Sequence, residues 1–148
     1  MQWHLFAIGK PKLGFARDGI LEYAKRLRPL AGVTIEYLKP TGGEDESAAL
    51  LRRSEGMYRV VLDESGGQCS SAELAGRVGQ WELDRVKSVA LLIGGADGHA
   101  RELRERADWL WSLGRLTFQH ELALVLVLEQ LYRAYAIKGG LPYHRGGN

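Results

Sequence analysis

Ser88-Val89-Ala90-Leu91-Leu92-Ile93-Gly94-Gly95 is a short apolar run that ends abruptly at a glycine pair. A run of this length without polar alternation is typical of a strand that helices cover on both faces, as in a parallel sheet. Strand patterns and helix patterns alternate along the chain on either side of it. The run therefore predicts a central strand of an α/β fold.

The α/β prediction rests on five repeats of a strand followed by a helix. Strands are expected at residues 3–8, 33–38, 58–62, 88–93 and 113–118, and helices at residues 15–27, 44–53, 71–83, 100–110 and 121–138. Ser70 precedes the third helix and can form a capping box with Glu73. Strands that alternate with helices predict a mainly parallel sheet with helices on both faces, joined by right-handed crossovers.

The last helix has an alternative interpretation, because residues 122–128 are all apolar and could form a buried strand. A helix is favoured because Leu131 and Tyr135 continue at helical spacing, and Glu129 and Arg133 are one turn apart. The first two turns are apolar on almost every side. This pattern favours a second subunit packed against the helix in a two-fold dimer, and the alternative is a helix buried within one chain.

Composition limits the class of protein. The chain has 148 residues, which suits a single domain over residues 1–148 with a substantial core. A lone cysteine, Cys69, rules out an internal disulfide, and no cysteine–histidine cluster has zinc-ligand spacing. Residues 122–128 form the longest apolar stretch, too short for a membrane span, and residues 1–10 lack the features of a signal peptide. These features predict a cytoplasmic protein with no metal site and no membrane segment.

The charge of +2 does not by itself indicate a nucleic-acid binder, but the charge is unevenly distributed. No acidic residue follows Glu129, whereas four residues with basic side chains do: Arg133, Lys138, His144 and Arg145. In this tail Tyr143 could stack on a base and Arg145 could bind a phosphate or an oxyanion. The simpler alternative is a solvated terminus with a surface ion pair between Glu129 and Arg133.

A ligand site is expected at the carboxyl ends of the strands, where open parallel sheets bind their ligands. Three such ends are predicted, at residues 62–64, 93–98 and 116–120. Gly94 and Gly95 would let a flat ligand approach the backbone, although most such pairs are simply turns. The chain lacks the spacing of a phosphate loop or a dinucleotide fingerprint, which argues against a small nucleotide-binding enzyme with an ordinary unknotted sheet.

The chain resembles the small SPOUT-superfamily methyltransferases that methylate N3 of a pseudouridine in large-subunit ribosomal RNA. The similarity is concentrated in four motifs, with a further match at residues 5–10. The motifs are Leu91-Leu92-Ile93-Gly94-Gly95 with Gly98, Trp111-Ser112-Leu113 followed by Leu116-Thr117 and His120, Glu129 with Leu131-Tyr132-Arg133-Ala134, and Pro142-Tyr143-His144-Arg145.

This resemblance implies a homodimer with a trefoil knot at its carboxy-terminal side, and the knot would form the S-adenosylmethionine pocket. The cofactor-binding residues that it implies are Leu62, Gly94, Gly95, Gly114, Arg115, Leu116, Thr117, Phe118 and Gln119. The RNA-binding residues that it implies are Arg133, Tyr143, His144 and Arg145, placed beside the cofactor of the partner subunit.

A chemistry for the tail follows from the implied reaction. An N3 imide must lose its proton, and Arg133 and Arg145 would stabilise the negative charge that develops on the base. His144 is expected to accept the proton, with Glu129 behind it. The alternative within the same fold is a non-catalytic ribosome-associated factor that binds RNA through this tail.

The chain departs from the family pattern at three places. Ala96-Asp97 stands where the family usually has Pro-Glu, and Glu121 and Leu124 stand where it commonly has a proline and an arginine. Residues 146–148 extend beyond the usual end. The missing arginine removes one positive charge from the neighbourhood of the expected pocket.

Overall fold

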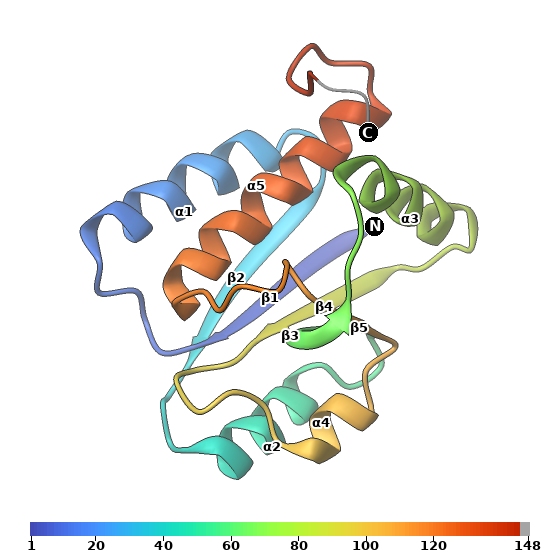
Figure 1. Ribbon diagram of the computed structural model, residues 1–148. Coiled ribbons are helices and arrows are strands. Elements are labelled where there is room, and N and C mark those ends of the chain that lie inside the picture. The colour runs from blue at the N-terminus through green and yellow to red at the C-terminus, as the bar shows by residue number, and fades with distance from the viewer. Residues whose placement is uncertain (146–148) are drawn as a thin grey trace.

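The computed structural model describes residues 1–145, and they form a five-stranded parallel sheet between two layers of helices (Figure 1). The strands are β1 (Gln2–Ile8), β2 (Gly32–Leu38), β3 (Tyr58–Gly67), β4 (Ser88–Ile93) and β5 (Trp109–Trp111), in the order β2-β1-β4-β3-β5. The helices are α1 (Gly14–Leu27), α2 (Gly43–Arg53), α3 (Ser71–Leu83), α4 (Arg101–Glu105) and α5 (His120–Lys138). The predicted α/β class is confirmed. The extension at residues 146–148 lies outside the described residues.

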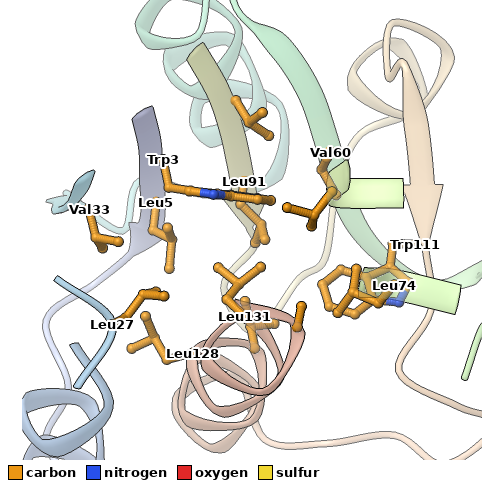
Figure 2. Close-up of a cluster of buried hydrophobic side chains, with 14 of the residues drawn as sticks. Trp3, Leu5, Leu27, Val33, Val60, Leu74, Leu91, Trp111, Leu128 and Leu131 are labelled. Carbon is orange, nitrogen blue, oxygen red and sulfur yellow. The ribbon is translucent and has the colours of Figure 1, made fainter. Parts of the chain in front are cut away.

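Strand β4 is buried on both faces, as its unbroken apolar run predicts. Val89, Leu91 and Ile93 face the core under α1, α3 and α5, whereas Ala90 and Leu92 face the core under α2 and α4. Figure 2 shows Leu91 in the first core, close to side chains of α5. The alternation of side chains along the strand thus joins two cores through one central element.

Residues 122–128 are helical, so the strand alternative is wrong. Helix α5 packs between α1 and α3 on one face of the sheet. Leu124, Leu128 and Leu131 are buried against the sheet. Leu122 and Leu126, on the outer side of the helix, are only partly buried. A partly exposed apolar strip therefore remains on α5 within a single chain.

The helix expected at residues 100–110 is too long, and the strand expected at residues 113–118 is not formed. Helix α4 ends at Glu105, because Asp108 pairs with Arg59 through its amide (2.9 Å) and its carboxylate (2.7 Å) and draws the chain into the sheet. The fifth strand is therefore Trp109–Trp111. The segment after it is a loop, which begins at a turn where the Ser112 hydroxyl donates to the Gly114 carbonyl (2.8 Å).

Strand β3 continues beyond Leu62, where the sequence pattern predicts its end, to Gly67. Leu62 and Gly67 both pair with Trp111, so the strand is irregular between these two residues. Gly66 is required there, because a Cβ atom would lie 2.5 Å from the carbonyl oxygen of Leu110. Gly66 therefore allows a close approach between the backbones of β3 and β5.

The described part of the chain contains neither a candidate membrane span nor a candidate metal-binding cluster. Between residues 1 and 145, no helix combines the length and the apolarity needed to cross a membrane. Within the same residues, no three histidine, cysteine or carboxylate side chains gather in a way that could hold a metal ion.

Candidate functional site

A cavity of about 490 Å³ opens at the carboxyl ends of β3, β4 and β5. Three segments form its wall: residues 62–64 of β3, residues 93–99 after β4, and residues 113–120 after β5, of which Arg115 alone does not line it. Ala123 of α5 closes one side. The three segments that the sequence singles out thus meet in one place, although the third, residues 116–120, follows the short strand β5 as a loop instead of ending a strand at 113–118.

The residues expected to bind a cofactor lie together around this cavity. Leu62, Gly94, Gly95, Gly114, Leu116, Thr117, Phe118 and Gln119 line it, whereas Arg115 does not. Leu116 is 74% exposed, so an apolar side chain stands at the wall with little protein over it. The cofactor-binding role of these residues stays a prediction, but the fold does bring them to a common surface.

Part of the cavity wall is formed by Gly94 and Gly95, where an added side chain would crowd its neighbours. A Cβ atom on Gly94 would lie 3.0 Å from Cε1 of His99, and one on Gly95 would lie 3.1 Å from Cγ2 of Ile8. Glycine at both positions lets the chain pass close to its neighbours and exposes backbone amides and carbonyls. Such a wall suits a flat ligand that is read through backbone hydrogen bonds.

The loop of residues 113–119 is held at both ends and in its middle. Gly114 has a φ of +146°, a conformation that favours glycine. Thr117 donates a hydrogen bond to Glu64 (2.8 Å), which joins the loop to β3. Gln119 caps α5 by accepting from the amides of Glu121 (2.8 Å) and Leu122 (3.0 Å). These contacts fix the wall that the strand prediction missed.

Two ionisable residues of the cavity wall, His99 and Asp63, were given no role from the sequence. His99 lies against Gly94, and burial lowers the pKa of its imidazole. Asp63 is partly buried, which opposes its charge, but hydrogen bonds from the hydroxyl and the amide of Ser65 lower its pKa overall. The only sequence signal for either residue is that it lies within a few residues of a predicted strand end.

Glu121, a departure from the family pattern, anchors another loop. Its buried carboxylate accepts hydrogen bonds from the amides of Lys12 (2.7 Å) and Leu13 (2.9 Å), where α1 begins. The amide of Leu13 makes the largest contribution to lowering the pKa of this carboxyl group. Because α1 has no side-chain cap of its own, Glu121 supplies a negative partner to its amino end from α5.

The residues expected to bind RNA and to carry the chemistry gather at the other end of α5. Arg133 forms an ion pair with Glu129 (2.7 Å), and its guanidinium lies 4.7 Å from the centre of the Tyr143 ring. The Tyr143 hydroxyl donates to Glu129 (2.7 Å). Arg133 also contacts Nδ1 of His144 (3.1 Å), and Arg145 is exposed. The tail is thus folded back on α5 instead of being solvated throughout.

The contacts in this cluster correct one expectation. Glu129 was expected behind His144, but Arg133 stands between them and takes both carboxylate oxygens. Burial opposes the charge of Glu129, yet hydrogen bonds from Arg133 and Tyr143 lower its pKa overall. Burial also raises the pKa of Tyr143, whose hydroxyl is engaged with Glu129. The Glu129–Arg133 pair is confirmed, as part of a larger network.

The cavity and the tail cluster are far apart within one chain. His120 of the cavity and Arg133 of the cluster are separated by 13 residues of continuous helix, which corresponds to about 20 Å at 1.5 Å per residue. The structure therefore brings the expected cofactor residues together and the expected catalytic residues together, but it does not join the two groups.

Comparison with known proteins gives concordant results. Residues 1–144 match the family described as "Predicted SPOUT methyltransferase". The chain is 45% identical to Ribosomal RNA large subunit methyltransferase H of Thermus thermophilus over 98% of its own length and 99% of that protein.

Solved structures with little sequence identity share the fold. A probable methylase family protein of Haemophilus influenzae superposes with a TM-score of 0.61 at 12% identity, over 99% of this chain and 71% of that one. A Legionella pneumophila protein solved in complex with the bound cofactor SAM gives a TM-score of 0.52 at 13% identity, over 90% and 66% of the two chains.

Proposed function

This chain belongs to the SPOUT methyltransferase family, and on that premise we propose that it methylates N3 of a pseudouridine in large-subunit ribosomal RNA. It is a methyltransferase that uses S-adenosylmethionine as its methyl donor. The relative from Thermus thermophilus, which matches over nearly the whole of both chains, gives ribosomal RNA as the substrate. What we propose beyond the substrate is the position of the methyl group, N3 of a pseudouridine.

The observation that carries the proposal is the cavity at the strand ends. Its volume of about 490 Å³ falls in the range of about 300–1,000 Å³ that is typical of pockets for small molecules and cofactors. Gly94 and Gly95 leave backbone groups open on one wall, as an adenine held by backbone hydrogen bonds requires. S-adenosylmethionine would supply an electrophilic methyl group there, held by Leu62, the pair Gly94-Gly95, Gly114 and residues 116–119.

The chain's own residues must align the nucleophile and stabilise charge. A displacement at a methyl carbon requires the target nitrogen to lie in line with the bond that breaks, with water excluded. The N3 atom must also lose a proton, and the resulting charge spreads over the base. Arg133 and Arg145 are the cations that stabilise this charge, and Glu129 holds Arg133 in place through the ion pair.

A homodimer reconciles the two halves of the site. Because about 20 Å of helix separates the cavity from the tail cluster, a second copy of the chain is needed to bring Arg133, His144 and Arg145 to a cavity. The partly exposed apolar residues Leu122 and Leu126 on α5 suit burial in such an interface. We extend the proposal accordingly: the tail of one protomer acts at the cavity of its partner, and the carboxy-terminal segment forms a trefoil knot.

The test is the methylation state of ribosomal RNA in cells. Mass spectrometry of large-subunit RNA should show one methyl group lost when the gene is deleted and restored by the parent gene. Purified protein with labelled S-adenosylmethionine, given intact ribosomes or free RNA from the deletion strain, should restore the mark. The proposal places this reaction in the cytoplasm. RNA binding without cofactor affinity would instead identify a non-catalytic factor.

A further inference from the structure

The contact between Arg133 and His144 fixes where the histidine carries its proton. Arg133 Nη1 lies 3.1 Å from His144 Nδ1. A guanidinium can only donate hydrogen bonds, so Nδ1 must accept and cannot bear a proton in this arrangement. The single ring proton then lies on Nε2.

Arg133 is itself held in place and cannot readily release the ring. Its Nη2 and Nε atoms donate to the two carboxylate oxygens of Glu129 (2.7 and 3.4 Å), and its guanidinium lies over Tyr143. The lowered pKa of Glu129 keeps the carboxylate ionised at neutral pH. From α1, Tyr23 approaches the Tyr143 hydroxyl (3.5 Å), and Arg26 lies over the Tyr23 ring. Tyr132 of α5 also packs against the Tyr143 ring, with 4.7 Å between the ring centres.

The Nε2 atom of His144 has no hydrogen-bond partner in the part of the chain that the structure describes, and it is shielded from solvent. A shielded donor without a partner costs free energy, so such groups in native proteins usually meet an acceptor when the site is complete. A nucleobase carbonyl is an acceptor of this kind. On this side the ring carries a donor, whereas a proton acceptor would need its lone pair free. Because Nε2 is covered in the free chain, the base reaches it only when the tail shifts on binding.

We propose that His144 acts on the bound base as a hydrogen-bond donor through Nε2–H, and not as the proton acceptor. This inference rests on the proposed function. N3 of the base is flanked by two carbonyl groups. It loses its proton to solvent water as the base binds, before water is excluded for methyl transfer, and the negative charge spreads onto both oxygens. The Nε2–H group donates to one of these oxygens, and the cations of the tail stabilise the remaining charge. The N3 electron pair then forms the bond to the methyl carbon while the pair of the broken C–S bond stays on sulfur.

The tautomer can be measured without substrate. Nitrogen-15 NMR of histidine-labelled full-length protein separates protonated from unprotonated ring nitrogens, and the chain has only four histidines to assign. The His144→Gln variant identifies the signals of His144 by their loss. We expect a proton on Nε2 in the parent, and loss of this single tautomer in Arg133→Met. A proton on Nδ1 in the parent overturns the inference.

The role in the reaction is measured with two substitutions at one position. The amide of His144→Gln retains an N–H donor but cannot accept a proton near neutral pH, whereas His144→Ala has neither function. We expect His144→Gln to keep a single-turnover rate within about fivefold of the parent, and His144→Ala to lose about a hundredfold, as for removal of one oxyanion donor. His4→Gln on β1, where His4 contacts Thr34, is the matched control and should match the parent.

The pH profile and the cofactor affinity separate the possible outcomes. A donor role predicts parallel pH–rate profiles for the parent and His144→Gln, because the ionisation of N3 sets the slope in both. Equal loss in His144→Gln and His144→Ala, with cofactor affinity intact, overturns this inference alone. A parent enzyme that does not methylate ribosomal RNA overturns the proposed function together with it.

Discussion

Replacing Glu121 by alanine should destabilise the folded chain more than any exposed charge would. The substitution removes two hydrogen bonds from a carboxylate that is 7% exposed, to the amides of Lys12 (2.7 Å) and Leu13 (2.9 Å). Hydrogen bonds to charged groups contribute about 1.5–3 kcal/mol each, and two bonds to one group are not additive, so we expect a loss of about 3 kcal/mol. In a domain of this size that corresponds to a fall in Tm of roughly 6–12 °C.

The contribution of the Glu121 carboxylate to folding stability should fall at acidic pH. The folded state lowers the pKa of Glu121 below its unfolded value, chiefly through the Leu13 amide. The stability from this charge is therefore fully present above the unfolded pKa of about 4.3, and it is lost as the pH falls through the folded pKa. The stability difference between the parent and Glu121→Gln, which keeps a neutral oxygen acceptor, should be largest at pH 7 and shrink below about pH 4.

Urea unfolding at fixed protein concentration, followed by circular dichroism, measures both effects. Glu102→Ala is a matched control, because Glu102 is an exposed glutamate whose ion pair with Arg106 is long (3.8 Å), and it should change stability by less than about 0.5 kcal/mol. If Glu121→Ala unfolds within that same margin of the parent at pH 7, or if the parent–Gln difference is independent of pH, the anchoring role assigned to Glu121 is wrong.

Three further predictions concern the core, a helix cap and the cavity. Leu128→Ala removes a fully buried side chain and should cost about 2–5 kcal/mol in urea unfolding; a loss under 1 kcal/mol would contradict its place in the core. Ser70→Ala removes the capping-box acceptor of α3 and should cost about 1 kcal/mol, while cofactor affinity stays at the parent value. Gly94→Val should push His99 toward the cavity and weaken S-adenosylmethionine binding at least tenfold by calorimetry, whereas Gly76→Ala, with no atom near the added carbon, should bind normally.

Local patterns predicted most of the fold because the strands and helices that define it bury repeating faces. The run from Ser88 to Ile93 needs no distant information to be identified as a covered strand, and it is one. Residues 113–118 misled the same reasoning, because Leu116 and Phe118 alternate with Arg115 and Thr117 as they would in a strand. The Ser112 turn and the positive φ of Gly114 break the strand geometry at its start.

The site could be predicted where motifs mark it and not where distant residues meet. The glycine pair after β4 is visible in the sequence, and it lines the cavity. Glu121 could not be assigned its role, because its partner Lys12 lies 109 residues away. The position of Arg133 between Glu129 and His144 likewise depends on how the tail folds back, which helical spacing alone does not determine.

Glu121 and Leu124 also bear on whether this chain has kept its activity, since they replace a proline and an arginine of the resembled family. Leu124 is 2% exposed and packs in the core under α1, α3 and α5, and neither residue lines the cavity. Position 124 does not face the cavity in this chain, so the absence of an arginine there removes no charge from the cavity wall. The cations that the proposed chemistry requires, Arg133 and Arg145, are both present. These two substitutions thus give no support to a non-catalytic factor, and Glu121 has acquired a structural function of its own.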